Sequence, residues 1–198
     1  MKPVIYRLCL LIFILSLTIS CRRGGEEKEF VVGVSHSSIN DSWRKAMMLD
    51  MQVKASDYPG MTLDVKDADE DNDTQIKQIR ELIKKRVDLI IISANESEPI
   101  TTAAVEAYRA GIPTIIIDRK IYSEEYTTFI GADNYEIGRA AGLFVNSLLK
   151  KKKTTIVEVW GREGSSSALD RHNGFSDALI HNNNVTVKTV YGRWHRDE

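Results

Sequence analysis

The feature that most constrains the fold of this chain is an alternation of short apolar runs with longer segments that carry one apolar stripe. The runs at residues 87–93 and 114–118 are nearly continuous in apolar, mostly β-branched residues. This composition is typical of strands buried on both faces of a parallel sheet. Between them, a helical pattern begins near Pro99 and stops at Gly111, because glycine commonly follows a helix end. A strand, a helix and a second strand in this order predict an α/β fold with right-handed crossovers.

The same alternation runs through most of the chain and divides it into two units. Strands are predicted at residues 30–35, 63–65, 87–93, 114–118, 126–132, 155–160 and 185–190. Helices are predicted at residues 42–55, 74–86 and 171–180, with others after Pro99 and after Asp133. Asp73 is the predicted cap of the helix at 74–86, and Asp133 or Asn134 that of a helix with the apolar face Ile137, Ala141, Phe144, Val145 and Leu148. We therefore predict an N-terminal α/β lobe at residues 30–132 and a partial second α/β lobe at residues 133–198. Two strands are too few to bury both faces of a helix and a sheet, so we expect the second lobe to be incomplete.

The N-terminal segment has the pattern of an export signal. Lys2 and Arg7 precede an apolar run at residues 8–19, which is shorter than the roughly 20 residues needed to span a bilayer. The run ends at Ser20-Cys21 and resembles a bacterial lipoprotein cleavage box, so we predict a signal at residues 1–21, lipidation of Cys21 and a charged tether at residues 22–29. An uncleaved N-terminal anchor and plain secretion are the alternatives. All three place the remainder in the periplasm, attached to the membrane only through its N-terminal end, if at all.

Charge and cysteine content exclude several kinds of partner. The chain has 27 basic and 28 acidic residues, so it lacks the positive surplus that favours nucleic acid. One of the two cysteines, Cys9, lies inside the signal. The exported part therefore has neither a disulfide framework nor a thiolate metal site.

Motifs for catalysis, metals or cofactors are weak. The four histidines have no metal-ligand spacing, and the acidic stretch at residues 67–73 lacks the central glycine of a calcium loop. The Gly-Ser-Ser-Ser-Ala sequence at residues 164–168 only approximates a nucleophile elbow, because Ala168 replaces the second glycine and no helix is expected to follow at once. There is no glycine-rich phosphate loop. We therefore predict a protein that is not an enzyme and has no catalytic residue, metal or cofactor.

Polar residues follow the predicted strands where a ligand would bind. In parallel α/β sheets, ligands bind outside the carboxyl ends of the strands. The stretches that follow the first five strands, at residues 35–44, 67–73, 93–98, 118–120 and 131–134, are rich in Asp, Asn, Ser and Arg. Carboxylates, guanidinium groups and amides hydrogen-bond hydroxyls, and an aromatic ring covers the C–H face of a sugar. Trp43 is our candidate for that ring, although it is also placed to be a core residue, and Asp118 is alternatively a cap for the loop that follows.

The order of these segments resembles a known family. Residues 31–35, 87–93, 111–119 and 130–134 are similar to the ribose/galactose-type periplasmic binding proteins, whose fold is shared with lactose-repressor effector domains. The resemblance implies the type I periplasmic-binding-protein fold, in which two Rossmann-like lobes with parallel sheets enclose a ligand. Here the second lobe would be incomplete.

Two further segments make the resemblance closer. The Asp-Ser-Trp-Arg sequence at residues 41–44 and the stretch at residues 133–139 resemble the periplasmic sensor region of Bacteroides-type hybrid two-component regulators. The resemblance implies that the ligand contacts are Asn40, Trp43, Asn95, Asp118, Arg119 and Arg171. The family's usual pair of stacked aromatic residues is here Ser42-Trp43, which keeps one ring.

The expected function is that of an exported sugar-binding, ligand-sensing domain. The leading hypothesis is the truncated sensor part of a hybrid two-component regulator, and the alternative is the substrate-binding lipoprotein of a sugar ABC transporter. The expected ligand is a monosaccharide or small oligosaccharide, and the expected partners are signalling kinase domains or an ABC permease. An intracellular repressor is disfavoured, because the chain begins with an export signal. With half of one wall missing, the chain by itself is expected to bind sugar weakly or not at all.

Overall fold

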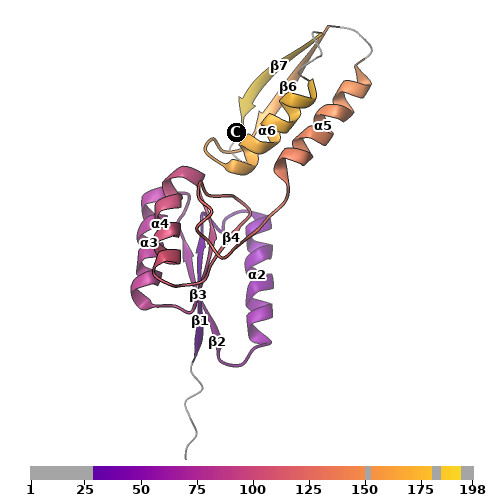
Figure 1. The fold of residues 1–198 in the computed structure, drawn as a ribbon. Helices are drawn as coiled ribbons and strands as arrows, with labels where there is room; N and C mark the ends of the chain where they lie inside the picture. The colour runs from indigo at the N-terminus through magenta and orange to yellow at the C-terminus, as the bar shows by residue number, and fades with distance from the viewer. Residues whose placement is uncertain (1–28, 150–152, 180–183, 193–198) are drawn as a thin grey trace, which may run out of the picture.

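The computed structural model describes residues 29–149, 153–179 and 184–192. The predicted signal, the tether and the lipidation at Cys21 lie outside these residues. The described part forms two α/β lobes that follow one another along the chain (Figure 1). We call the part that contains the five-stranded sheet the first lobe, and the part that follows it, with a two-stranded sheet within the described ranges, the second lobe.

The sheet of the first lobe is parallel throughout, as the sequence predicts. Its strands are β1 (Phe30–His36), β2 (Met61–Asp67), β3 (Leu89–Ser93), β4 (Thr114–Ile117) and β5 (Thr128–Ile130), in the order β2-β1-β3-β4-β5. Strand β5 is shorter than the predicted strand at residues 126–132. The chain first moves outward from β1 to β2 and then returns past β1 to β3. This reversal is the switch point at which open α/β sheets bind ligands.

Three helices cover the two faces of this sheet (Figure 1). Helices α3 (Asn72–Lys85) and α4 (Ser97–Arg109) lie on one face, and α2 (Ser42–Ser56) lies on the other. The predicted cap of α3 is wrong, because the helix begins earlier than the apolar stripe suggests. Asp71, not Asp73, accepts the capping hydrogen bond, from the backbone N–H of Thr74 at 2.7 Å.

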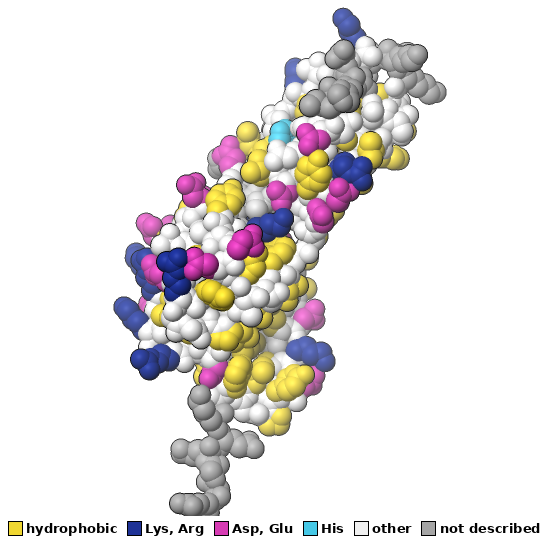
Figure 2. All heavy atoms as spheres, viewed as in Figure 1, with side chains coloured by type: hydrophobic (Ala, Val, Ile, Leu, Met, Phe, Trp, Pro, Cys, Tyr) yellow, Lys and Arg dark blue, Asp and Glu magenta, His cyan; other side chains and the backbone are white. Residues whose placement is uncertain are grey.

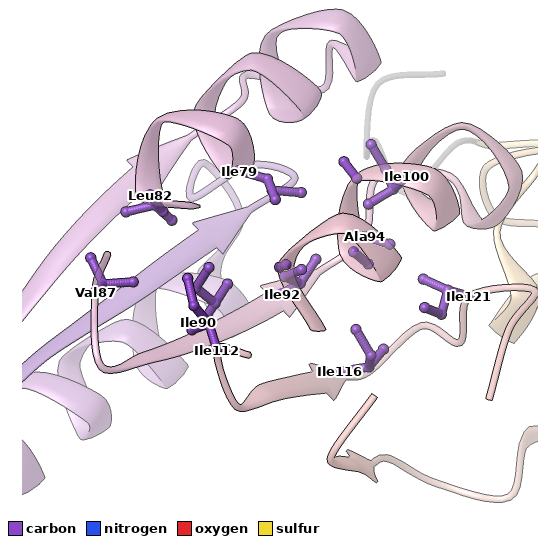
Figure 3. Packing of buried hydrophobic residues seen from close by; sticks show 13 residues of the cluster. Ile79, Leu82, Val87, Ile90, Ile92, Ala94, Ile100, Ile112, Ile116 and Ile121 are labelled. Atoms are coloured by element: carbon purple, nitrogen blue, oxygen red, sulfur yellow. The ribbon is translucent and has the colours of Figure 1, made fainter. Parts of the chain in front are cut away.

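The main core lies between the sheet and the α3–α4 layer. Isoleucines of β3 and β4 point toward Ile79 and Leu82 of α3 and Ile100 of α4 (Figure 3). A Cβ atom on Gly33 would lie 2.9 Å from the Leu82 methyl groups, so glycine at this position of β1 lets α3 pack closely against the sheet. Burial of these side chains contributes roughly 1.5–3 kcal/mol each.

The opposite face of the sheet is covered less completely. Within the described residues only α2 packs on it, over Val32 and Val34, and Ile91 and Ile115 remain half-buried. Figure 2 shows the same asymmetry, with charged side chains gathered over the α3–α4 side and hydrophobic ones more frequent toward α2.

The second lobe contains α5 (Asn134–Leu148), β6 (Thr154–Trp160), α6 (Ser166–Leu179) and β7 (Val185–Tyr191). Strands β6 and β7 pair in parallel, as predicted. Asp133 caps α5 by accepting from the N–H of Glu136 at 3.0 Å. Helix α6 begins at Ser166, five residues before the predicted start, and so a helix does follow the Gly-Ser-Ser-Ser-Ala sequence directly. Small polar residues in its first turn hide this start from an apolar periodicity. No helix in the described ranges is long and apolar enough to cross a membrane.

Helices α5 and α6 pack through glycine rather than through the predicted apolar face. A Cβ on Gly138 would overlap the carbonyl oxygen of Arg171, and a Cβ on Gly174 would overlap that of Tyr135. The two backbones are therefore in direct contact. The predicted face of α5 is instead largely exposed, including Ile137 and Phe144.

Candidate ligand-binding site

A cavity of about 760 Å³ lies at the carboxyl end of the first sheet and is bounded on its far side by α6. Its lining divides into two parts of different chemistry. The polar end consists of Asp41, Arg44, Asp118, Arg119, Ser167 and Arg171, with Trp43 beside it, and the apolar end consists of Met47, Met51, Ile91, Ile115, Ile117 and Ile130. The apolar end is the incompletely covered sheet face beside α2, and it offers no partner to a hydroxyl group. Only the polar end suits a sugar.

Asp118 stands at the centre of the polar end. It follows β4 with φ at +64°, and its backbone N–H donates to the carbonyl of Ile130 at 3.0 Å. A left-handed conformation in a residue other than glycine is uncommon and occurs often at functional sites. The Asp118 carboxylate lies 3.8 Å from the guanidinium groups of both Arg44 and Arg119. These separations exceed hydrogen-bond distance, so the charges attract one another while leaving hydrogen-bonding capacity unused.

Arg119 is a buried guanidinium held by backbone carbonyls. Its Nη1 donates to the carbonyl oxygens of Ala94 at 3.2 Å and Asn95 at 2.5 Å, while its Nε has no hydrogen-bond partner. Burial, with the neighbouring charge of Arg44 as the second cause, lowers the pKa of Arg119 to about 10. The side chain therefore stays charged at neutral pH. An unpaired buried N–H is a costly group to leave unsatisfied, and the carboxylate of Asp118 lies 3.8 Å from it.

Asp41 and Arg44 belong to the polar end although the sequence did not single them out as contacts. Asp41 caps α2 by accepting from the N–H of Arg44 at 2.8 Å, and its second oxygen accepts from the Arg44 side chain at 2.6 Å. Burial alone would raise the pKa of Asp41, but the hydrogen bonds from the Arg44 backbone and side chain lower it below the ordinary value. The missed signal is the spacing of three residues, which brings two side chains together on a helical turn.

Trp43 and Arg171 approach the cavity from opposite lobes. Trp43 is 54% exposed and therefore not a core residue, and the Arg44 guanidinium carbon lies 5.9 Å from its ring centroid. Arg171 projects from α6 and donates through Nε to Asn134 at 2.8 Å. Both residues line the cavity, one from each lobe, and contact of either with a ligand stays a prediction.

Asn40 and Asn95 do not line the cavity. Asn40 is exposed and donates to Asp69 at 3.1 Å. Asn95 is buried, and its amide donates to the carbonyl of Glu70 and the side chain of Asn72, both at 2.8 Å. In this arrangement Asn95 supports Arg119 through its carbonyl group, and direct contact of either asparagine with a ligand stays a prediction.

The polar end of the cavity suits the binding of a hydroxyl-rich ligand. Its groups are carboxylates, guanidinium groups and one aromatic ring, which are hydrogen-bonding and stacking partners for a polyol. None of the described residues forms a group of three or more metal-ligating side chains, and no histidine lines the cavity.

Several known proteins are similar to this chain in sequence or in structure. The "Galactofuranose-binding protein YtfQ" of Escherichia coli is 30% identical over 79% of this chain. The solved "fructose binding periplasmic domain of hybrid two component system BT1754" is 42% identical over 84% of this chain, with a TM-score of 0.78. The binding protein of the arabinose ABC transporter from Shewanella, solved with arabinofuranose, is 29% identical over 84%, with a TM-score of 0.75.

These proteins are longer than the present chain, which covers 50%, 55% and 56% of them in the same order. The chain thus spans about half the length of the curated relatives it matches. They are named for binding sugars and not for an enzyme activity, and the type I fold predicted from the resemblance is confirmed. Residues 32–198 match the family model described as a periplasmic binding protein domain, and the chain belongs to this family.

Proposed function

We propose that the polar end of the cavity binds a monosaccharide between the two lobes. The observation that carries the proposal is the Asp118 carboxylate, which lies 3.8 Å from two guanidinium groups without a hydrogen bond to either. A sugar hydroxyl placed there would donate to Asp118 and accept from the guanidinium group of Arg119 or Arg44. Trp43 would cover the C–H face of the ring, and Arg171 would close the site from the second lobe.

The sugar that we favour is one in furanose form. Two of the similar proteins are named for galactofuranose and arabinofuranose, and a third is named for fructose. Binding would shift the protein toward a closed arrangement of the lobes that a partner reads.

The role that we favour is the sensor part of a hybrid two-component regulator, with signalling kinase domains as partners. The support is the higher identity to such a domain, 42% against 29–30% for the transporter component and the galactofuranose-binding protein. The substrate-binding lipoprotein of a sugar ABC transporter is the alternative. The gene that follows distinguishes the two: a kinase frame supports the sensor, and a permease with an ATPase supports the transporter.

The family places the protein in the periplasm, and we propose anchoring by lipid on Cys21 or by an uncleaved N-terminal segment. Mass spectrometry of the purified N-terminus separates these cases. A lipidated cysteine as the first residue, lost in Cys21→Ala, supports the lipid anchor, and an intact Met1 supports the uncleaved segment.

Calorimetric titration with fructose, arabinose, ribose and galactose tests the binding proposal. We expect Asp118→Ala and Arg171→Ala each to weaken binding about 10- to 100-fold, since hydrogen bonds to charged groups contribute roughly 1.5–3 kcal/mol. Met51→Leu, at the apolar end, is the matched control and should keep its affinity. The 198-residue chain is expected to bind weakly. A longer form, in which the second lobe is extended to the length of the relatives, is therefore titrated beside it and is called the form with a complete second lobe. Unchanged affinity in both polar variants would refute the site.

A further inference from the structure

The loop between β6 and α6 makes a second contact between the lobes, separate from the cavity. We define residues 162–166 as the interlobe loop. They belong to the second lobe and contact three loops of the first, which follow β2, β3 and β4. None of them lines the cavity. Their contacts therefore need an explanation other than ligand binding.

The first contact is an ion pair shared by two loops. The Arg162 Nη2 is hydrogen-bonded to the carboxylate of Glu70, and its Nη1 lies 3.9 Å from the carboxylate of Glu96. The Arg162 side chain is 19% exposed, and the two acids are 34% and 31% exposed. Partial burial and two partners make this network stronger than an isolated surface pair.

The first lobe holds Glu70 in place without help from the second. Its φ is +63°, its backbone N–H donates to the carbonyl of Ser37 at 2.7 Å, and its carbonyl accepts from Asn95 at 2.8 Å. The first lobe therefore fixes the backbone of Glu70, and only its side chain has to be ordered when it pairs with Arg162. Such preorganisation reduces the entropy lost when the pair forms.

The second contact completes the N-terminus of α4. The residue before this helix, Glu96, provides no side-chain cap, and the N–H of Ser97 donates instead to the carbonyl of Gly164 at 3.0 Å. The first N–H groups of a helix otherwise need another partner. Gly164 has φ at +74°, and a Cβ there would lie 3.1 Å from the Glu96 side chain, so a glycine suits both the conformation and the close approach. The N–H of Lys120 also donates to Ser166 Oγ at 2.8 Å.

We propose that Arg162 is a positioning residue for sugar binding, which acts by holding the two lobes closed through the interlobe loop. It touches no ligand. Its effect on affinity depends on the proposed function, because the apparent dissociation constant equals the intrinsic one divided by the closed fraction. Its effect on the lobes does not depend on sugar and can be measured alone.

The closed fraction can be measured on the 198-residue chain without sugar, by energy transfer between two dyes. The dyes are attached to the variants Lys77→Cys and Lys188→Cys, and Cys9 and Cys21 are replaced by serine so that they are not labelled. Both labelled positions are exposed, one on each lobe. We expect Arg162→Gln to lower the transfer efficiency, and Arg162→Lys to restore part of it. Raising the salt concentration should lower the efficiency of the parent chain and have less effect on Arg162→Gln, because salt screens the ion pair.

Exchanging the two charges tests whether Glu70 is the partner through which Arg162 acts. Arg162→Glu should open the lobes, and the double variant with Glu70→Arg should close them again. In a form with a complete second lobe, Arg162→Gln should raise the apparent dissociation constant for the bound sugar about three- to tenfold. Circular dichroism checks that each variant folds. If Arg162→Gln fails to fold, Glu70→Gln removes the same ion pair from the other lobe and gives an independent measurement.

Two failures are distinguishable. If the transfer efficiency responds to Arg162 and the form with a complete second lobe binds none of the sugars, the interlobe contact is supported and the sugar site is not. Sugar binding with a transfer efficiency that neither Arg162→Gln nor Glu70→Gln changes would overturn the contact's role.

Discussion

At the scale of single residues, position after a strand predicts which loops surround the cavity but not which of their side chains line it. Asp118 and Arg119 follow a buried strand, and the structure places both at the cavity. Asn40 and Asn95 also follow strands, yet their amides bond to neighbouring loops. The difference depends on φ/ψ angles in the loops, such as the left-handed Asp118, and a periodicity does not encode these angles. Helical spacing would have identified Asp41 and Arg44 together.

His36 gives a prediction at this scale. It is buried at the end of β1, its Nε2 lies 2.9 Å from the Met48 sulfur, and its Nδ1 has no hydrogen-bond partner. Burial lowers the pKa of His36, and Arg44 lowers it further, against smaller opposing effects of Asp67 and Asp41. The unfolded chain therefore takes up a proton near pH 6.5 that the folded chain does not. The free energy of unfolding should fall below that pH, by at most about 1.4 kcal/mol per unit.

Urea denaturation at pH 7.5, 6.5 and 5.5 measures this effect. His36→Gln should lose stability less steeply than the parent chain as the pH falls. His172→Gln, at a more exposed histidine, is the control. Equal slopes in His36→Gln and the parent would show that His36 is not the group responsible.

At the scale of elements, apolar patterns predict strands well and helix ends poorly. The buried strands were found because burial on both faces requires continuous apolar runs. The start of α6 was missed because its first residues carry no apolar signal: Ser166 accepts from the backbone of Lys120 in the other lobe, and Ser167 is hydrogen-bonded to Ser165. The contact between α5 and α6 was missed for a related reason: it depends on glycines, which allow backbones to touch and contribute no hydrophobic side chain.

The glycine contact predicts a destabilising substitution. Gly174→Ala would place a methyl group on the carbonyl oxygen of Tyr135 and force the helices apart. We expect the free energy of unfolding to fall by about 1–3 kcal/mol, as for other overpacked sites, despite the better helix propensity of alanine. Asn173→Ala, at the exposed neighbouring position, is the control and should not be destabilised. Chemical denaturation followed by circular dichroism measures both, and equal stabilities would contradict the close packing.

At the scale of the whole molecule, the two lobes and their parallel sheets could be predicted, and the way they meet could not. Alternation of strands and helices specifies each sheet, because each pattern reflects local burial. The contacts of Arg162 and Gly164 with the first lobe join residues more than sixty positions apart, and no local pattern encodes them. The cavity's apolar end was likewise unforeseen, since it is the sheet face beside α2 that the described residues leave partly open.

A crystal structure of a form with a complete second lobe, grown with the sugar that binds most tightly in calorimetry, tests the central claim most directly. We expect sugar hydroxyls within hydrogen-bond distance of the Asp118 carboxylate and the Arg119 guanidinium group, the ring against Trp43, and Arg171 on the opposite side. A sugar bound elsewhere, with Asp118 and Arg119 paired only to each other and to Arg44, would contradict it.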